Sequence, residues 1–292
     1  MIDRFGLVIG AMKAGTTTLY EHLARHPHIA GSTPKEPGFF AFDDIYGRGR
    51  DWYEGLFGFD PSVHKIALDA STDYAKFPHC RDVPARMKAH GGEFRLIYSL
   101  RNPLRRIESH ALHVQHKGRE VGRIDTERKD HSLDAGVSPV SIDICRYAMQ
   151  LDQYKDYVDR GALIITSVER LAADPAGVAR AACVHLGVDP ALLPAEVERR
   201  NEAGRTRRAH ETHPFWRAAS SIAPLKAAAK ALVPKETRDR LRNRMRPAIE
   251  AKGRFRLYPE EECGIIDLLK DDLLRLRDVY GFDAAREWGI AL

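Results

Sequence analysis

The chain has 292 residues, 43% of them hydrophobic, which is enough to bury the core of one large α/β domain or of two small ones. Basic residues outnumber acidic ones by 46 to 41, but the surplus is concentrated at 199–256, where 17 basic residues accompany 5 acidic ones. No apolar run approaches the roughly 18 residues of a spanning helix, which excludes a membrane span. The four cysteines lack metal-binding spacing, which excludes a cysteine-based metal site.

Short apolar runs rich in β-forming residues alternate with helical patterns through most of the chain. The predicted strands are 5–9, 65–68, 94–100 and 162–166, and the predicted helices are 16–25, 83–90, 103–116, 142–158 and 175–186. Strand and helix in alternation predict a parallel sheet, with ligands at the carboxyl ends of its strands. The sequence therefore predicts a single α/β domain over 1–292, in which helices cover both faces of a central sheet.

A glycine turn rich in hydroxyl groups follows the first predicted strand. It reads G-A-M-K-A-G-T-T-T-L over 10–19 and opens a helix, whose N-terminus presents unpaired N–H groups and partial positive charge. Candidates for holding a phosphate-like group are Lys13, Ala14, Gly15, Thr16, Thr17 and Thr18. In the nucleoside-triphosphate loop the lysine follows the last glycine, whereas here it precedes that glycine, so the nucleoside-triphosphate pattern fails at its defining position.

A second strand, turn and helix carry the sequence R-N-P-L-R-R-I-E-S at 101–109. Arg101 directly follows the predicted strand 94–100, and Ser109 lies about two helical turns further on. The planar fork of an arginine suits a phosphate, to which it can donate two hydrogen bonds. This segment is therefore a second candidate phosphate site.

Together the two loops resemble those of the sulfotransferases that use 3′-phosphoadenosine 5′-phosphosulfate (PAPS). In that family K-x-G-T-T holds the 5′-phosphosulfate, and R-x-P-x-x-R-x-x-S holds the 3′-phosphate. A late K-G-R loop also covers the 3′-phosphate, and it is similar to Lys252, Gly253 and Arg254 here. The resemblance implies a P-loop-like three-layer fold, PAPS as donor, 3′,5′-adenosine bisphosphate (PAP) as product, and no metal requirement.

The segment P-K-E-P-G-F-F at 34–40 resembles the K-E-x-x-F-F of carbohydrate sulfotransferases, including those acting on heparan sulfate. There the glutamate is the general base, so the resemblance implies that Glu36 deprotonates the acceptor and that Lys13 stabilises the leaving phosphate. Phe39 and Phe40 are predicted to pack and anchor the loop. Small-molecule sulfotransferases use a histidine instead, which keeps His110 open as an alternative base.

The acceptor class is left open by one departure from the heparan-type pattern. Where those enzymes read E-K-T-P-x-Y, this chain reads D-A-S-T-D-Y from Asp69 to Tyr74, without the lysine. A carbohydrate or glycoconjugate is favoured, while a lipid or natural product remains an alternative. More remote alternatives are a nucleotide-dependent phosphotransferase and a non-catalytic glycan- or lipid-binding protein.

Two charged segments lack a clear element assignment. Residues 117–140 show no apolar period and are predicted to form a mobile loop near the acceptor. The basic stretch 199–256 is predicted to be a helical excursion that serves as a lid, a surface helix, or a contact with an anionic membrane or glycan. No nucleic-acid module is recognisable, so no such partner is expected. The absence of a leader or anchor pattern predicts a cytoplasmic, bacterial enzyme.

Overall fold

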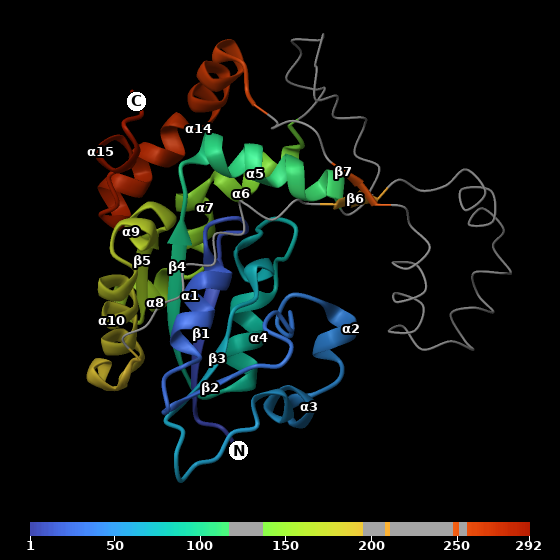
Figure 1. The fold of residues 1–292 in the computed structure, drawn as a ribbon, viewed down its shortest axis with the longest axis vertical. Coiled ribbons are helices and arrows are strands. Elements are labelled where there is room, and N and C mark those ends of the chain that lie inside the picture. The colour runs from blue at the N-terminus through green and yellow to red at the C-terminus, as the bar shows by residue number, and fades with distance from the viewer. Residues whose placement is uncertain (117–136, 195–207, 211–247, 251–255) are drawn as a thin grey trace, which may run out of the picture. The chain divides into compact units, whose positions relative to one another are not determined.

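The computed structural model describes residues 1–116, 137–194, 208–210, 248–250 and 256–292. Figure 1 shows the fold as a ribbon. The contacts within the chain divide it into two units. The first comprises Met1–Ile107, Val137–Arg200 and Leu257–Leu292, and the second comprises Glu108–Gly136 and Asn201–Arg256. The single domain predicted over 1–292 stays a prediction.

A parallel five-stranded sheet forms the centre of the first unit. Its strands are β1 (Arg4–Gly10), β2 (Ile29–Gly31), β3 (Ile66–Asp69), β4 (Glu93–Leu100) and β5 (Leu163–Ser167), in the spatial order β2-β3-β1-β4-β5. Each neighbouring pair is parallel. The central strands β1 and β4 are almost continuously apolar and buried, as expected for a sheet covered on both faces. The predicted parallel α/β architecture is confirmed.

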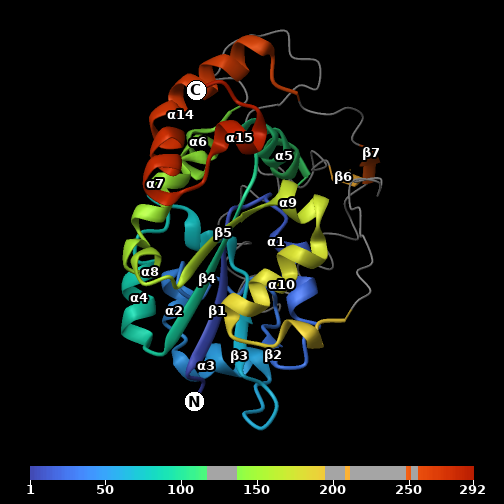
Figure 2. The same cartoon turned by 90° about the vertical axis from the view of Figure 1, so that its left-hand side faces the viewer.

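Helices cover both faces of this sheet (Figure 2). Those packed on one face are α1 (Thr16–Leu23), α9 (Val168–Ala173) and α10 (Pro175–Leu186), which share an aliphatic core with Val8 and Ile97. On the other face, Phe5 and Phe94 join an aromatic cluster with Tyr53 and His90, from α3 (Arg50–Glu54) and α4 (Val83–His90). This arrangement gives the three predicted layers.

Further helices and turns occur along the chain. They include α2 (Asp43–Tyr46), α5 (Pro103–His116), α14 (Pro259–Tyr280), α15 (Ala284–Trp288) and the 3₁₀ turns η1 (Gly55–Phe57), η2 (Thr72–Ala75) and η4 (Pro190–Leu192). Within the described residues, no helix is both long and apolar enough to cross a membrane.

The single helix predicted at 142–158 is wrong. The structure has three short helices there: α6 (Pro139–Cys145), α7 (Tyr147–Asp152) and α8 (Lys155–Asp159). Arg146 and Tyr154 leave the helical conformation at the two breaks. The buried Asp272 of α14 accepts hydrogen bonds from Ala148 N (3.0 Å) and Met149 N (2.8 Å), which satisfies the start of α7.

The two segments predicted to be irregular or basic lie mostly outside the described residues. Of 117–140, the residues 137–140 are described, and the last two begin α6. Of 199–256, the described residues include two short antiparallel strands, β6 (Arg208–His210) and β7 (Ala248–Glu250), where a helical excursion was predicted. Pairing between distant segments replaces helix at these positions.

Replacing Asp272 with alanine is expected to lower the free energy of unfolding by about 1–2 kcal/mol, because two first-turn N–H groups of α7 lose their acceptor. The measurement is urea unfolding followed by circular dichroism. Asp271→Ala changes the exposed neighbouring carboxylate and is the control, expected to shift stability by less than about 0.5 kcal/mol. Equal losses in both variants would contradict this capping role.

Candidate active site

The glycine turn between β1 and α1 is tightly folded and fastened to β4. Lys13 and Gly15 both adopt positive φ angles, 73° and 77°, and Ala14 N donates to Ala11 O at 3.1 Å. Ser99, near the end of β4, secures the turn twice. Its carbonyl accepts from Ala11 N at 2.7 Å, and its hydroxyl donates to Ala14 O at 2.7 Å. Sequence reasoning missed Ser99, whose place within an apolar strand gave no signal.

Gly15 is required at the start of α1 by both conformation and space. A Cβ there would lie 2.9 Å from Val168 Cγ2, because α9 packs directly against the turn. The three threonines that follow differ in exposure: Thr16 is buried, whereas Thr17 and Thr18 are exposed. The helix N-terminus therefore presents two hydroxyl groups to solvent beside its first N–H groups.

Arg101 links the second predicted loop to the first. Its Nη1 donates to Lys13 O at 2.9 Å, and its own carbonyl accepts from Tyr147 Oη at 2.6 Å. Asn102 then starts α5, since its side-chain oxygen accepts from Leu104 N at 3.0 Å. The structure thus brings together Lys13 and Arg101, which are far apart in the sequence.

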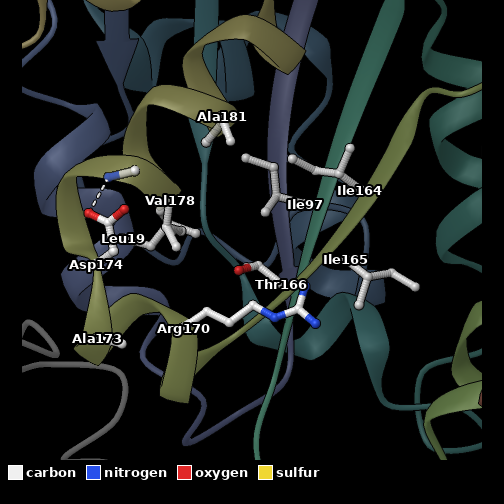
Figure 3. Close-up of a pocket in the computed structure, with 12 residues that line it drawn as sticks. Leu19, Ile97, Ile164, Ile165, Thr166, Arg170, Ala173, Asp174, Val178 and Ala181 are labelled. Carbon is white, nitrogen blue, oxygen red and sulfur yellow. Dashed lines mark hydrogen bonds between the residues drawn. The ribbon is translucent and has the colours of Figure 1, made fainter. Parts of the chain in front are cut away.

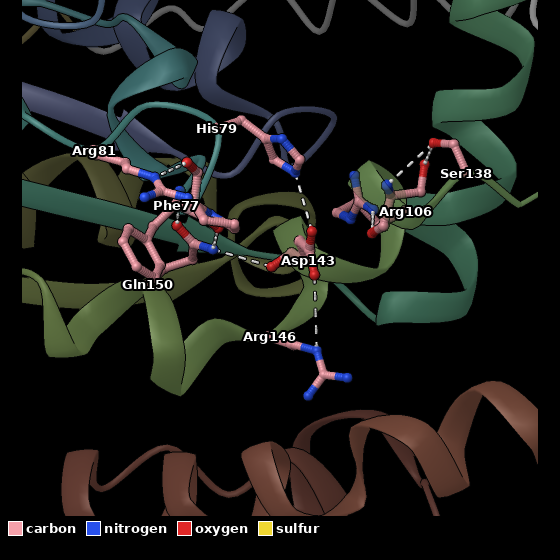
Figure 4. Close-up of polar contacts among 10 residues, drawn as sticks. Phe77, His79, Arg81, Arg106, Ser138, Asp143, Arg146 and Gln150 are labelled. Atoms are coloured by element: carbon pink, nitrogen blue, oxygen red, sulfur yellow. Dashed lines mark hydrogen bonds and ion pairs between the residues drawn. The ribbon is translucent and has the colours of Figure 1, made fainter.

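The other arginine of the motif, Arg106, is fully buried and serves packing. It donates to Cys145 Sγ at 2.9 Å and to the carbonyl of Ser141, both on α6. Arg106 itself is labelled in Figure 4. Cationic Arg106 opposes the effect of burial on the Cys145 thiol, but burial dominates and raises the pKa of that thiol. Arg106 therefore fastens α5 to α6.

A polar cluster, also drawn in Figure 4, ties the segment after η2 to α6 and α7. Gln150 exchanges two hydrogen bonds of 2.8 Å with the backbone of Phe77, and its amide nitrogen also reaches Asp143 O at 3.0 Å. The half-exposed His79 lies with Nε2 at 3.0 Å from Asp143 Oδ2. Sequence reasoning had assigned no role to this cluster.

Of the site residues predicted in the second unit, the structure describes only Ser109 and His110. Ser109 is half-buried and His110 is 7% exposed, both on α5. Within the same unit, Arg256 donates to Glu108 at 2.9 Å. Lys252, Gly253 and Arg254 lie outside the described residues. The predicted contacts of these positions to a nucleotide stay predictions.

Glu36 lies on the loop that leaves β2, and its side chain is 42% exposed. The neighbouring Lys35 forms an ion pair with it and also donates to Ala70 O at 3.3 Å. Because β1, β2 and β4 are parallel strands of one sheet, the loop that carries Glu36 leaves the sheet at the same edge as the turns that carry Lys13 and Arg101. Phe39 and Phe40 are buried, as predicted for residues that anchor this loop.

Asp69, at the end of β3, is a buried carboxylate beside that loop. Burial raises its pKa to about 6, although hydrogen bonds from Tyr74, Ser71 and Tyr53 act in the opposite direction. Sequence reasoning noted Asp69 only as part of a polar strand end. The buried hydroxyl donors around it could not be identified from that pattern.

A separate pocket of about 490 Å³ opens between α1, α10 and the edge strand β5 (Figure 3). Its walls are mostly aliphatic, including Leu19, Ile97, Ile164 and Val178, with Arg170 and Asp174 at its polar side. None of the predicted site residues lines it. Among the described residues there is also no group of three or more potential metal ligands.

These features define an α/β protein in which a glycine turn and a helix N-terminus lie at the carboxyl edge of a parallel sheet. A sulfotransferase structure from Alicyclobacillus acidocaldarius has the same fold, with a TM-score of 0.55 and 24% identity over 80% of this chain and 96% of that chain. The predicted P-loop-like three-layer fold, with a central parallel sheet flanked by helices, is therefore confirmed. No family model matches the sequence.

Sequence comparison gives more specific relatives. The chain is 32% identical over 177 residues to human heparan sulfate glucosamine 3-O-sulfotransferase 6, covering 59% of this chain and 48% of that protein. It is 29% identical over 188 residues to mouse heparan sulfate glucosamine 3-O-sulfotransferase 3B1, covering 62% of this chain and 45% of that protein. The chain thus spans about half the length of these curated relatives. The predicted resemblance to the PAPS-dependent sulfotransferases is confirmed.

Replacing Gly15 with alanine is expected to destabilise the fold by about 2–4 kcal/mol, because left-handed strain adds to a clash with Val168. Gly58→Ala is the matched control, since Gly58 is also left-handed but has open space around it. It is expected to cost only about 1–2 kcal/mol. Chemical unfolding measures both, and an equal cost would contradict tight packing of α9 on the turn.

The Asp69 carboxyl is expected to make stability depend on pH. Because its pKa is raised in the folded state, its contribution is complete below about pH 4 and is lost as the pH rises through about 6. Asp69→Asn should therefore flatten the pH dependence of the free energy of unfolding by up to about 3 kcal/mol between pH 4 and 7. Exposed Asp44→Asn is the control, expected to retain the wild-type slope.

Proposed function

We propose that this chain transfers a sulfuryl group from PAPS to a hydroxyl or amine of a carbohydrate or glycoconjugate. The observation that carries the proposal is the Arg101–Lys13 hydrogen bond, which joins two phosphate-type loops at one sheet edge. Similarity to heparan sulfate sulfotransferases supports the choice of a sulfuryl donor over a nucleoside triphosphate. The order of Lys13 and Gly15 supports it independently.

The described residues fit such a donor. The exposed Thr17 and Thr18 stand at the N-terminus of an eight-residue helix, directly after a turn in which Lys13 and Gly15 adopt positive φ angles. Lys13 and this turn would hold the 5′-phosphosulfate, while Arg101 and Ser109 would hold the 3′-phosphate. The donor supplies an activated S–O bond, and the protein supplies fixed positive groups around the leaving phosphate.

Glu36 is proposed as the general base. Its exposed carboxylate would accept the proton of the acceptor hydroxyl as the acceptor oxygen bonds to sulfur and the bond from sulfur to the phosphate oxygen breaks. Lys13 would stabilise the charge that develops on that oxygen, and PAP would leave. His110 stays the alternative base, with a lipid or natural product as the alternative acceptor.

The acceptor is proposed from the curated relatives, whose names specify heparan sulfate glucosamine. Another relative at 26% identity is the human bifunctional heparan sulfate N-deacetylase/N-sulfotransferase 2, of which the chain covers 22%. Both O- and N-sulfation are therefore represented among these relatives. Contact of 199–256 with a membrane or glycan stays a prediction, as does the cytoplasmic, bacterial location, which none of the comparisons supports.

Substitution separates the donor site from the base. Lys13→Ala is expected to lower turnover about a hundredfold or more, and Arg101→Ala to weaken PAP binding about ten- to a hundredfold. Glu36→Gln should lower turnover by about 10²–10⁴ while PAP binding is retained. PAP binding is measured by thermal stabilisation, and turnover by transfer of labelled sulfate from PAPS to desulfated heparan sulfate.

Lys88→Ala, an exposed lysine on α4, is the charge-matched control and should bind PAP like the wild type. Stabilisation by Mg-ATP but not by PAP would contradict the proposal in favour of a phosphotransferase. Full activity of Glu36→Gln would move the base to another residue.

A further inference from the structure

A buried carboxylate lies directly behind the loop that carries Glu36. Asp69 is 0% exposed and accepts three hydrogen bonds, from Tyr53 Oη (3.0 Å), Ser71 Oγ (2.7 Å) and Tyr74 Oη (2.6 Å). All three donors are neutral hydroxyl groups. The backbone N–H of Ser71 also acts on this carboxyl. A buried carboxylate held by neutral groups costs stability compared with an apolar residue, so its presence is better explained by positioning than by stability.

Two of the three hydroxyl groups also accept hydrogen bonds from backbone N–H groups of the loop that carries Glu36. Gly38 N donates to Ser71 Oγ at 2.9 Å, and Phe40 N donates to Tyr74 Oη at 3.4 Å. A hydroxyl that donates its only proton to Asp69 must accept through a lone pair. Asp69 therefore orients both hydroxyl groups as acceptors for the loop.

The loop is also fastened on the other side of Glu36. Ala70 N donates a hydrogen bond to Lys35 O at 3.2 Å, and Lys35 Nζ donates one to Ala70 O at 3.3 Å. Beyond Glu36, the buried Phe39 stacks on Tyr53 with ring centroids 4.3 Å apart. Residues before and after Glu36 are thus held by 69–74, while the Glu36 carboxylate itself stays 42% exposed.

We propose that Asp69 is a positioning residue for the reaction, which acts through Ser71 and Tyr74 to fix the loop that presents the general base Glu36. The inference rests on the proposed function, because it assigns Glu36 the base role. It adds a structural cause for the orientation of that base: the end of β3 holds the loop that leaves the neighbouring strand β2.

Two hydroxyl deletions test the proposal. Ser71→Ala removes the acceptor for Gly38 N and one donor to Asp69. Tyr53→Phe is the matched control, because it also removes one hydroxyl donor from Asp69 but leaves the loop backbone bonded and keeps the aromatic stack on Phe39. If Ser71→Ala fails to fold, Tyr74→Phe removes the corresponding bond to Phe40 N.

Three readouts are compared in the full chain. Amide hydrogen exchange in a peptide covering 34–42 is expected to accelerate about tenfold in Ser71→Ala, and turnover to fall about tenfold. The KM for PAPS and the thermal stabilisation by PAP should stay within about twofold of wild type, since the donor loops lie on other strands. Tyr53→Phe should leave both the exchange and the turnover within about twofold of wild type.

Unchanged exchange in Ser71→Ala would overturn the anchoring, and faster exchange with unchanged turnover would overturn its role in the reaction. Equal effects of Tyr53→Phe and Ser71→Ala would show that only the burial of Asp69 matters, which also overturns the proposal. Failure of the proposed function would be seen separately, as absence of PAP stabilisation in the wild-type protein.

Discussion

The attachment of the glycine turn to the end of β4 is the constraint on which the candidate site depends. Ser99 holds the turn through Ala11 and Ala14, and Arg101 holds it through the carbonyl of Lys13. These bonds form because β1 and β4 are direct neighbours in the sheet, so that both strands deliver their following turns to the same place. Strand order, rather than any local motif, joins the two loops.

A corresponding attachment operates on the other side of β1. There, β2 and β3 are neighbours, and residues after β3 hold the loop that follows β2. The sheet therefore carries two adjacent pairs of strands, one for each proposed role. The pair β1–β4 fixes the groups assigned to the donor, and the pair β2–β3 fixes the group assigned to the acceptor proton. Because both pairs belong to one sheet, the groups assigned to the donor and the group assigned to the acceptor proton are held on the same rigid frame.

Local motifs made the turns and their flanking elements predictable. The helices at Val83–His90, Pro103–His116 and Pro175–Leu186 agree with the sequence periodicity, because each has an early proline and an apolar face. The prediction of a single helix at 142–158 missed the first break, at Arg146, because the helix start that follows it is stabilised by Asp272, 124 residues away from Ala148. Short β2 was missed because its three residues carry no alternating pattern.

The candidate site shows the same limit of prediction. Lys13, Arg101 and Glu36 could be predicted as candidates because each lies in a short motif that resembles one found in the sulfotransferases. Ser99 and Ser71 were not found as anchors, since a serine at a strand end has many structural uses. Their roles depend on which backbone group faces the hydroxyl, and that is decided by the pairing of strands.

Asp69 and Arg106 illustrate two different uses of a buried charge. Arg106 lies among the neutral acceptors of α6, and its hydrogen bonds join that helix to α5. Asp69 is bonded to hydroxyl groups that lead to the loop beside the exposed Glu36. Burial of Asp69 raises its pKa, which means that its ionised form opposes folding at neutral pH. A group that costs stability while orienting the backbone of an exposed carboxylate is better explained by positioning than by stability.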